Sequence, residues 1–241
     1  MKALILAAGE GSRLRPLTSD KPKPMLPIAG RPLLEHILLW LKGHGVHEVA
    51  INLHYKPEAI TGYLGDGARW GMAITYSPED PVLGTAGAAK KLEGYFRAEA
   101  FLVVYGDVLT DLDLGALVGF HRSRGGVATL ALYRVENPSA CGLVDVDGRG
   151  RIRAFVEKPP PDEVFTDLAN AGVLVLEPEI FDHIPPGIPY DFGLDLLPRL
   201  LQEGVALYGQ PISDDEYLID IGTLDKYERA QGEWQSGEVL S

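Results

Sequence analysis

Cysteine, cationic residues and long apolar segments are all scarce in this sequence. Its 241 residues include one cysteine, Cys141, which excludes a disulfide within the chain and is typical of a reducing compartment. Lysine and arginine number 22 against 34 aspartates and glutamates, so the net charge of −12 argues against nucleic acid or an anionic membrane as a partner. The first apolar run is only a strand long, which argues against a signal peptide or a membrane span, and we expect a cytoplasmic protein.

The spacing of apolar residues predicts strands that alternate with helices. In the first part of the chain, strands are expected at residues 4–8, 48–53, 72–76 and 101–105, and helices at 32–44, 57–64, 86–95 and 113–124. This alternation predicts an α/β protein with a doubly wound, Rossmann-like and mostly parallel sheet.

The second part of the chain has a different pattern of expected elements. Strand-like segments at 127–135, 142–146 and 152–156 are separated by turn residues, which predicts a small inserted β-hairpin region. The remaining expected elements are strands at 171–176, 205–210 and 217–219 and helices at 179–183, 192–201 and 224–234. The sequence has no internal repeat, and its length suits a single domain over residues 1–241.

The loop after the first strand carries the most specific pattern in the chain. Gly9 and Gly11 follow the strand directly, and glycine lets a backbone approach a ligand closely. Four cations fall within eleven positions of this otherwise acidic chain, namely Arg13, Arg15, Lys21 and Lys23. Prolines on either side of Lys23 restrict the backbone that presents it. A tight turn beside a solvated basic surface would explain each feature alone, but together they predict a cradle for a triphosphate.

Two aspartates also follow expected strands. Asp107 comes after residues 101–105, and Asp220 comes after residues 217–219. Ligands of open α/β sheets bind outside the carboxyl ends of the strands, so we expect these two carboxylates to share one cleft. Mg²⁺ is commonly held by one or two carboxylates together with substrate phosphates. An Asx turn or a helix cap would explain either aspartate alone, whereas the pair predicts a Mg²⁺ site.

Seven segments, taken in their order, resemble the sugar-1-phosphate nucleotidyltransferases, also called nucleotide-sugar pyrophosphorylases. These segments are Leu6–Thr18, Lys21–Pro27, Leu83–Gly87, Gly106–Asp107, Phe155–Pro159, Asn170–Gly172 and Asp220–Thr223. The resemblance covers nearly the whole chain and is closest to the pattern of mannose-1-phosphate guanylyltransferases. It implies a glycosyltransferase-A-like fold, with a nucleotide-binding half at residues 1–125 and a sugar-binding half at residues 126–241.

The resemblance also implies roles for individual residues. The residues expected to act in catalysis are Arg13, Lys23, Asp107 and Asp220, and the two aspartates would bind Mg²⁺. Those expected to bind the nucleotide are Ala7, Gly9, Gly11, Ser12, Gly84, Thr85 and Gly87. Those expected to bind the sugar phosphate are Gly142, Glu157, Lys158, Asn170 and Gly172. Lys23 would contact the α-phosphate, and Lys158 would neutralise the phosphate of the sugar.

The implied reaction joins a sugar 1-phosphate to the α-phosphorus of a nucleoside triphosphate and releases pyrophosphate. Residues 137–142, 157–159 and 190–193 resemble the guanylyltransferase pattern, which favours GTP and mannose 1-phosphate. UTP or dTTP with glucose, N-acetylglucosamine or N-acetylmuramic acid 1-phosphate are the alternatives. The chain has no hexapeptide repeats after Asp220, so a C-terminal β-helix is not expected, and a homo-oligomer is compatible with the sequence.

Three rival interpretations stay open at this point. A Rossmann dehydrogenase would have a third glycine where Leu14 stands. A catalytically silent subunit that senses nucleotide sugars would be expected to lack Lys23 or one of the two aspartates, and this chain keeps all three. A phosphocholine cytidylyltransferase is disfavoured by Glu157-Lys158-Pro159 and by Asn170-Ala171-Gly172, which are of the sugar type.

Overall fold

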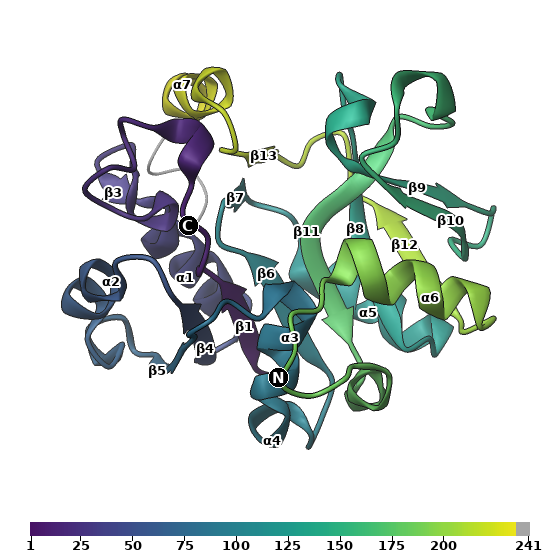
Figure 1. Ribbon diagram of the computed structural model, residues 1–241, viewed down its shortest axis with the longest axis horizontal. Coiled ribbons are helices and arrows are strands. Elements are labelled where there is room, and N and C mark those ends of the chain that lie inside the picture. The colour runs from purple at the N-terminus through teal and green to yellow at the C-terminus, as the bar shows by residue number, and fades with distance from the viewer. Residues whose placement is uncertain (235–241) are drawn as a thin grey trace. The chain divides into compact units, whose positions relative to one another are not determined.

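The computed structural model describes residues 1–234 (Figure 1). The chain forms two compact units, and each is assembled from separate segments. The first unit comprises Met1–Val82, Val104–Asp113 and the segment that starts at Asp214. The second unit comprises Leu83–Val103 and Leu114–Ser213. Strand β6 (Phe101–Tyr105) therefore begins in the second unit and ends in the first.

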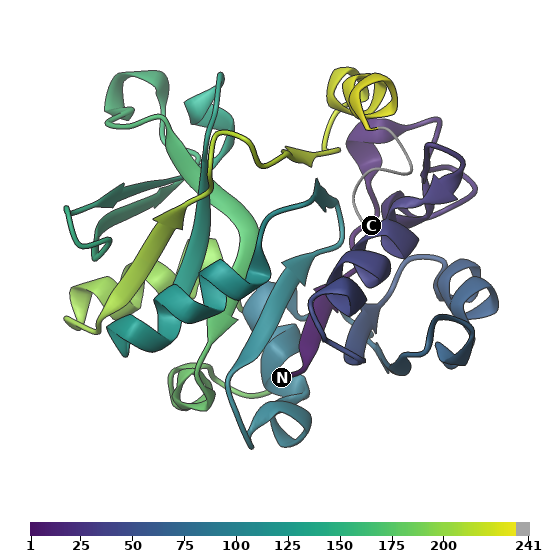
Figure 2. The ribbon, with the colours of Figure 1, turned by 180° about the vertical axis from the view of Figure 1, so that it is seen from behind.

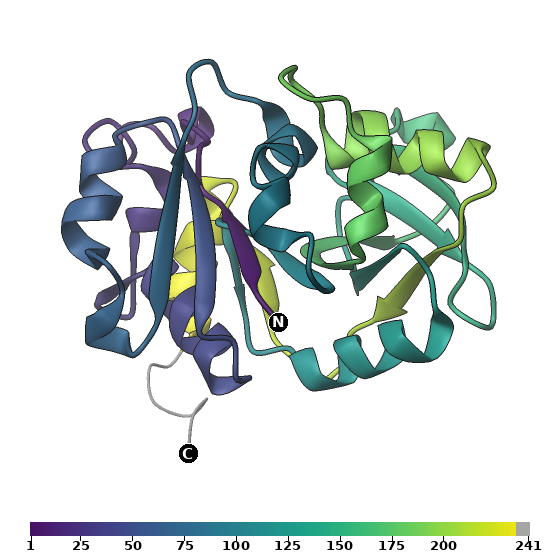
Figure 3. The same ribbon diagram turned by 90° about the horizontal axis from the view of Figure 1, so that it is seen from below.

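Parallel strands form the core of the first unit. β4 (Glu48–Leu53) lies between β1 (Ala3–Leu6) and β5 (Ala73–Pro78), and both pairings are parallel (Figure 3). Helices α1 (Leu33–Gly43) and α2 (Pro57–Leu64) make the two crossover connections. The side chains of β1 and β4 are mostly buried and aliphatic, as the sequence pattern of a strand covered on both faces predicts.

Shorter elements complete the first unit. β7 (Val108–Thr110) pairs antiparallel with β13 (Leu218–Asp220), and β2 (Pro27–Ile28) pairs antiparallel with β3 (Arg31–Pro32). Three 3₁₀ helices cover Ser12–Leu14 (η1), Lys23–Met25 (η2) and Ala68–Trp70 (η3). The last helix, α7 (Leu224–Glu233), lies beside the purple segment that follows β1 in Figures 1 and 2. The Tyr227 hydroxyl of this helix donates to the Pro27 carbonyl at 2.8 Å.

The second unit is richer in antiparallel strands. β9 (Gly142–Val146) lies between β10 (Ile152–Glu157) and β11 (Leu168–Leu176), and β8 (Ala128–Arg134) pairs with β11, all antiparallel. β12 (Leu207–Pro211) adds to β8 in parallel (Figure 2). The helices are α3 (Gly84–Lys91), α4 (Glu93–Phe96), α5 (Leu114–Arg124) and α6 (Leu197–Gln202), with 3₁₀ helices at Pro138–Ala140, Pro161–Glu163 and Pro178–His183. None of the helices within residues 1–234 is both long and apolar enough to cross a membrane.

The predicted α/β class, the parallel central strands and the β-rich insertion are confirmed. Several boundaries differ from the prediction. β1 ends at Leu6 rather than at Ala8, because the amide of Ala7 donates to the Asn52 side chain. The helix expected at 192–201 opens with a π-helical turn, Phe192–Leu196, whose first amides bond to the Asp191 carboxylate. β7 was not predicted, because a three-residue strand depends on its distant partner β13.

His36 on α1 lies between two other parts of the first unit. The imidazole contacts the Ile28 carbonyl through Nε2 at 2.9 Å and the Trp234 indole nitrogen through Nδ1 at 3.3 Å. The neutral tautomer with its proton on Nε2 satisfies both contacts, since it donates to the carbonyl and accepts from the indole. Burial lowers the pKa of His36 below its ordinary value, against the opposing effect of the hydrogen bond to Ile28.

We expect His36 to make the stability of the protein depend on pH. Because the pKa is lower in the folded state, the stability that His36 contributes is present above the unfolded-state pKa of about 6.5. It is lost as the pH falls from that value toward the folded-state pKa. His36→Gln should therefore show a smaller loss of unfolding free energy between pH 7.5 and pH 5.5 than the wild type, measured by urea denaturation. The exposed His47 gives a matched control, His47→Gln, and an unchanged pH dependence in His36→Gln would contradict the prediction.

Candidate active site

The loop after β1 turns at Gly11, whose φ of +63° lies in the left-handed region that favours glycine. The Gly11 carbonyl accepts a hydrogen bond from the buried Thr18 hydroxyl at 2.9 Å. A Cβ on Gly11 would stand 3.0 Å from the Cβ of Lys23, so the glycine lets the loop pack against the Lys23 segment. A Cβ on Gly9 would meet no atom within 4 Å, and the backbone there is open to a ligand.

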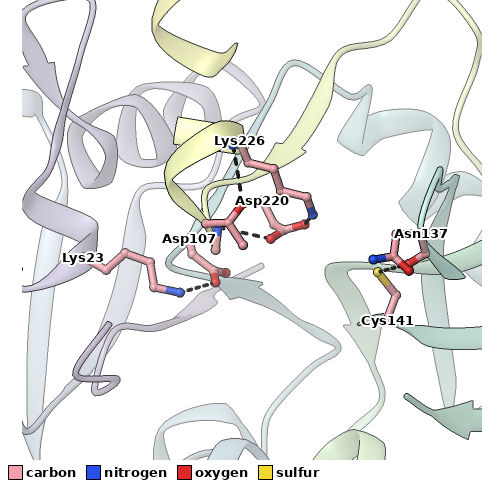
Figure 4. Close-up of polar contacts among 8 residues, drawn as sticks. Lys23, Asp107, Asn137, Cys141, Asp220 and Lys226 are labelled. Carbon is pink, nitrogen blue, oxygen red and sulfur yellow. Dashed lines mark hydrogen bonds and ion pairs between the residues drawn. The ribbon is translucent and has the colours of Figure 1, made fainter. Parts of the chain in front are cut away.

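Lys23 and Asp107 form an ion pair in this unit. The Lys23 ammonium donates to Oδ2 of Asp107 at 2.6 Å (Figure 4), and the two side chains are 15% and 25% exposed. The position of Asp107 follows from that of Gly106. The Gly106 amide donates a hydrogen bond to the Leu6 carbonyl at 2.9 Å. A Cβ on Gly106 would stand only 2.6 Å from that oxygen. The glycine therefore lets the chain pass close to the end of β1 and places the following carboxylate there.

The pairing of β7 with β13 brings Asp220 to the same place. Asp220 stands opposite Val108 in the ladder, and the Ile221 amide donates to the Asp107 carbonyl at 2.9 Å. The Asp220 carboxylate accepts hydrogen bonds from the Gly222 amide at 3.2 Å and from the Lys226 ammonium (Figure 4). Thus two carboxylates that are distant in the sequence become neighbours through backbone hydrogen bonds.

Arg13 lies beside this group. It belongs to η1, where it and Ser12 are exposed, and a Cβ on Gly222 would stand 3.3 Å from its guanidinium. Gly222 is itself held by Asp220, so the Arg13 cation and the Asp220 carboxylate flank the same glycine. Three cations of the first unit, Arg13, Lys23 and Lys226, therefore lie around the two aspartates at the start of β7.

The two aspartates are a donor set that suits Mg²⁺. Mg²⁺ takes hard oxygen ligands, and it is typically bound by one or two carboxylates while waters and substrate phosphates supply the rest. Asp107 and Asp220 provide such a pair from a backbone that the ladder holds in place. Within residues 1–234, no group of three or more histidine, cysteine, aspartate or glutamate side chains is arranged to hold a metal ion.

Two buried polar residues behind the loop were not selected from the sequence. The Ala7 amide donates to Oδ1 of Asn52 at 2.7 Å, and the Asn52 amide donates to the Glu79 carboxylate at 3.0 Å. Asn52 and Glu79 are 3% and 4% exposed. This relay fixes the backbone at Ala7, where the loop begins. The signal in the sequence is Asn52, a polar residue inside the otherwise apolar run 49–53 of β4.

The second unit holds the residues that the resemblance assigns to the sugar phosphate. Gly142 and Glu157 are opposite each other in the ladder of β9 and β10. A Cβ on Gly142 would stand 2.5 Å from Oε2 of Glu157, so the glycine makes room for the carboxylate. Lys158 follows with a φ of +48°, and its ammonium lies 3.0 Å from Oε1 of Glu157. The Lys158 side chain is 61% exposed and its charge faces solvent.

Asn170 and Gly172 lie within β11 rather than in a turn after a strand. The register against β8 shifts between Asn170 and Leu174, and Gly172 has a φ of +73°. Oδ1 of Asn170 accepts a hydrogen bond from the Gly172 amide at 3.1 Å. The motif therefore forms an irregularity in a buried strand, which is a common way to re-aim a side chain. Cys141 precedes β9, and its sulfur lies 3.9 Å from the Asn137 carbonyl (Figure 4).

Gly84, Thr85 and Gly87 open α3 in the same unit. A Cβ on Gly84 would stand 2.6 Å from the Tyr190 carbonyl, and one on Gly87 would stand 2.9 Å from the Ile188 carbonyl. Within this unit, the glycines therefore allow α3 to pack closely against residues 188–190. The Thr85 hydroxyl donates to the Asp191 carboxylate at 2.9 Å. That these three residues bind a nucleotide stays a prediction.

Asn52→Leu should destabilise the first unit by about 2–4 kcal/mol, because the buried Ala7 amide and the buried Glu79 carboxylate both lose a partner. Urea denaturation measures this change. Glu79→Gln provides the comparison, since it keeps an acceptor for the Asn52 amide and should cost less. A loss below about 0.5 kcal/mol for Asn52→Leu would show that the relay does not support the loop.

Comparisons with known proteins agree with this geometry. Residues 2–236 match the family model described as nucleotidyl transferase. The chain is 40% identical to a UTP–glucose-1-phosphate uridylyltransferase of Synechocystis, with coverage of 95% of this chain and 62% of the relative. It is 38% identical to a mannose-1-phosphate guanylyltransferase of Mycobacterium tuberculosis, with coverage of 98% and 65%. The chain thus spans less than two thirds of the length of either relative.

Solved structures give similar results. A putative glucose-1-phosphate thymidylyltransferase from Bacillus anthracis, in complex with a sucrose, matches with a TM-score of 0.86 and 25% identity over 100% of this chain and 98% of that one. HddC from Yersinia pseudotuberculosis, complexed with GMP-PN, matches with a TM-score of 0.81 and 27% identity over 97% and 99%. These neighbours have the glycosyltransferase-A-like fold that the sequence predicted. From the family match over nearly its whole length, the chain belongs to the nucleotidyl transferase family.

Proposed function

We propose that this chain transfers a nucleotidyl group from a nucleoside triphosphate to a sugar 1-phosphate, which gives an NDP-sugar and pyrophosphate. The observation that carries the proposal is the group of Arg13, Lys23, Asp107 and Asp220, gathered by backbone and side-chain contacts beside the glycine loop after β1. This group occurs in a chain of the nucleotidyl transferase family.

The residues of the first unit have the chemistry that a triphosphate requires. The loop from Ala7 to Ser12, which is open at Gly9, would approach the phosphates, and Arg13 and Lys23 would neutralise them. The Lys23 ammonium is held by Asp107, which orients it without removing its charge. Asp107 and Asp220 would hold Mg²⁺, which supplies further compensation for the charge on the phosphates.

The residues of the second unit suit a sugar phosphate. The Glu157 carboxylate would accept hydrogen bonds from sugar hydroxyls, with Gly142 leaving room beside it. The exposed Lys158 ammonium would pair with the phosphate. Asn170 and Gly172 would contribute from the irregular part of β11, and Gly84, Thr85 and Gly87 would bind the nucleotide.

The chemistry requires no nucleophile from the protein. An oxygen of the sugar 1-phosphate attacks the α-phosphorus, a new P–O bond forms, and the bond to the β-phosphate oxygen breaks as pyrophosphate leaves. Two anions must be brought in line at short range, and the charge that develops on the leaving group must be compensated. Arg13, which lies beside Gly222, and Lys23, which pairs with Asp107, would supply this compensation.

We propose GTP and mannose 1-phosphate as the substrates, on the pattern of residues 137–142 and 190–193 and on the similarity to the mycobacterial guanylyltransferase. The second candidate is UTP or dTTP with glucose 1-phosphate. The 40% identity with the uridylyltransferase and the structural match to the thymidylyltransferase favour it.

Release of pyrophosphate tests the reaction and names the substrates together. The assay combines GTP, UTP, dTTP, CTP and ATP with mannose, glucose, N-acetylglucosamine and N-acetylmuramic acid 1-phosphates in the presence of Mg²⁺. We expect one strong combination, and GTP with mannose 1-phosphate is the expected one. No release in any combination, from folded protein that binds an NDP-sugar, would support a sensing role instead.

Asp107→Ala and Asp220→Ala should each lower kcat by about 10²–10³-fold, because each removes a carboxylate of the proposed metal pair. Circular dichroism should show an intact fold. Asp162→Ala, which changes an exposed aspartate of the second unit, is the matched control and should keep the wild-type rate. A near-normal rate in either of the first two variants would remove that aspartate from the metal site.

A further inference from the structure

Gly193 shapes the surroundings of Glu157 in the second unit. A Cβ on Gly193 would stand 2.8 Å from Oε2 of Glu157 and 3.4 Å from its carboxyl carbon. The same oxygen lies 2.5 Å from where a Cβ on Gly142 would stand. The carboxylate thus fits against two residues that have no side chain. One of them, Gly193, ends the segment 190–193 of the guanylyltransferase pattern, but the resemblance implies no role for it.

The segment that carries Gly193 is fixed by hydrogen bonds. Oδ1 of Asp191 accepts from the Gly193 amide at 2.8 Å and from the Leu194 amide at 3.2 Å, which caps the π-helical turn. Oδ2 of Asp191 accepts from the Thr85 hydroxyl at 2.9 Å, and that hydroxyl accepts from the Phe192 amide at 2.8 Å. The position of Gly193 is therefore set by Asp191 and Thr85, and it cannot retreat from Glu157 without breaking these bonds.

A methyl group at position 193 would clash with the Glu157 carboxylate, and the less rigidly held of these two groups would move. The Gly193 backbone is held by the cap, whereas Oε2 is the far end of a flexible side chain. Gly193 does not have a left-handed φ, so alanine fits its backbone conformation. A methyl group there would leave the fold intact and move the Glu157 carboxylate.

We propose that Gly193 is a positioning residue that determines specificity for the sugar, because it fixes where the Glu157 carboxylate is directed. This inference rests on the proposed function, in which Glu157 accepts hydrogen bonds from sugar hydroxyls. Hydrogen-bonding sites discriminate strongly between substrates, since a misplaced partner leaves polar groups unpaired. Discrimination between sugar 1-phosphates that differ at one hydroxyl therefore depends on residue 193.

Gly193→Ala should raise KM for the preferred sugar 1-phosphate by about tenfold or more, with KM for the nucleotide changed by less than about twofold. Gly119→Ala on α5 is the matched control, because a Cβ there would meet no atom within 4 Å. Thermal unfolding should show both variants folded. Equal KM values for the sugar phosphate in Gly193→Ala and Gly119→Ala would overturn the proposal.

A double-mutant cycle separates positioning from a general loss of structure. In a Glu157→Ala background there is no carboxylate to displace, so Gly193→Ala should leave kcat/KM for the sugar phosphate unchanged within about twofold. The same loss in both backgrounds would overturn the proposal.

Calorimetric titration of wild type and Gly193→Ala with mannose 1-phosphate and with glucose 1-phosphate distinguishes this inference from the proposed reaction. If the wild type binds a sugar 1-phosphate and Gly193→Ala binds it more weakly, the positioning role is supported even without turnover. A failure of turnover alone would contradict only the transferase reaction. Equal binding by the two proteins would overturn the positioning role.

Discussion

The antiparallel pairing of β7 with β13 is the interaction on which the candidate active site depends. It sets Asp220 opposite Val108, and the Ile221 amide continues it with a bond to the Asp107 carbonyl. Backbone hydrogen bonds have little freedom in distance or direction, so the ladder holds the main chain that carries the two aspartates. Charge compensation then follows, since each aspartate accepts from a lysine and Arg13 lies beside the same turn.

The absence of a side chain at certain glycines shapes the structure as much as the polar side chains do. Glycines stand where a Cβ would collide with a backbone carbonyl, as at Gly84 and Gly106, or with the Glu157 carboxylate, as at Gly142 and Gly193. The collisions with backbone would force elements apart. Those with the carboxylate would move the end of Glu157, and at Gly142 the Phe155 ring as well. The first pair of glycines therefore supports packing, and the second pair acts on the proposed chemistry.

Most of the fold and much of the site were predictable from local patterns. Alternating apolar segments specify strands and helices because their side-chain periods differ, and this is why β4, α2 and β6 match their predicted limits. Prediction failed where a distant partner decides the structure. β7 forms only against β13, and the turn at residues 192–196 takes a π-helical form capped by Asp191. Asn170 lies in β11, one residue before the predicted start of that strand, because β8 pairs with it there.

The sequence by itself determined the α/β class, the family and the residues that could carry phosphate chemistry, because strand periodicity and the order of motifs are properties of neighbouring residues. Only the tertiary structure decided which polar atoms meet. The relay from Ala7 to Asn52 and the contact of Gly193 with Glu157 join segments far apart in the chain. Such meetings depend on register and side-chain direction across packed elements, which no local period encodes.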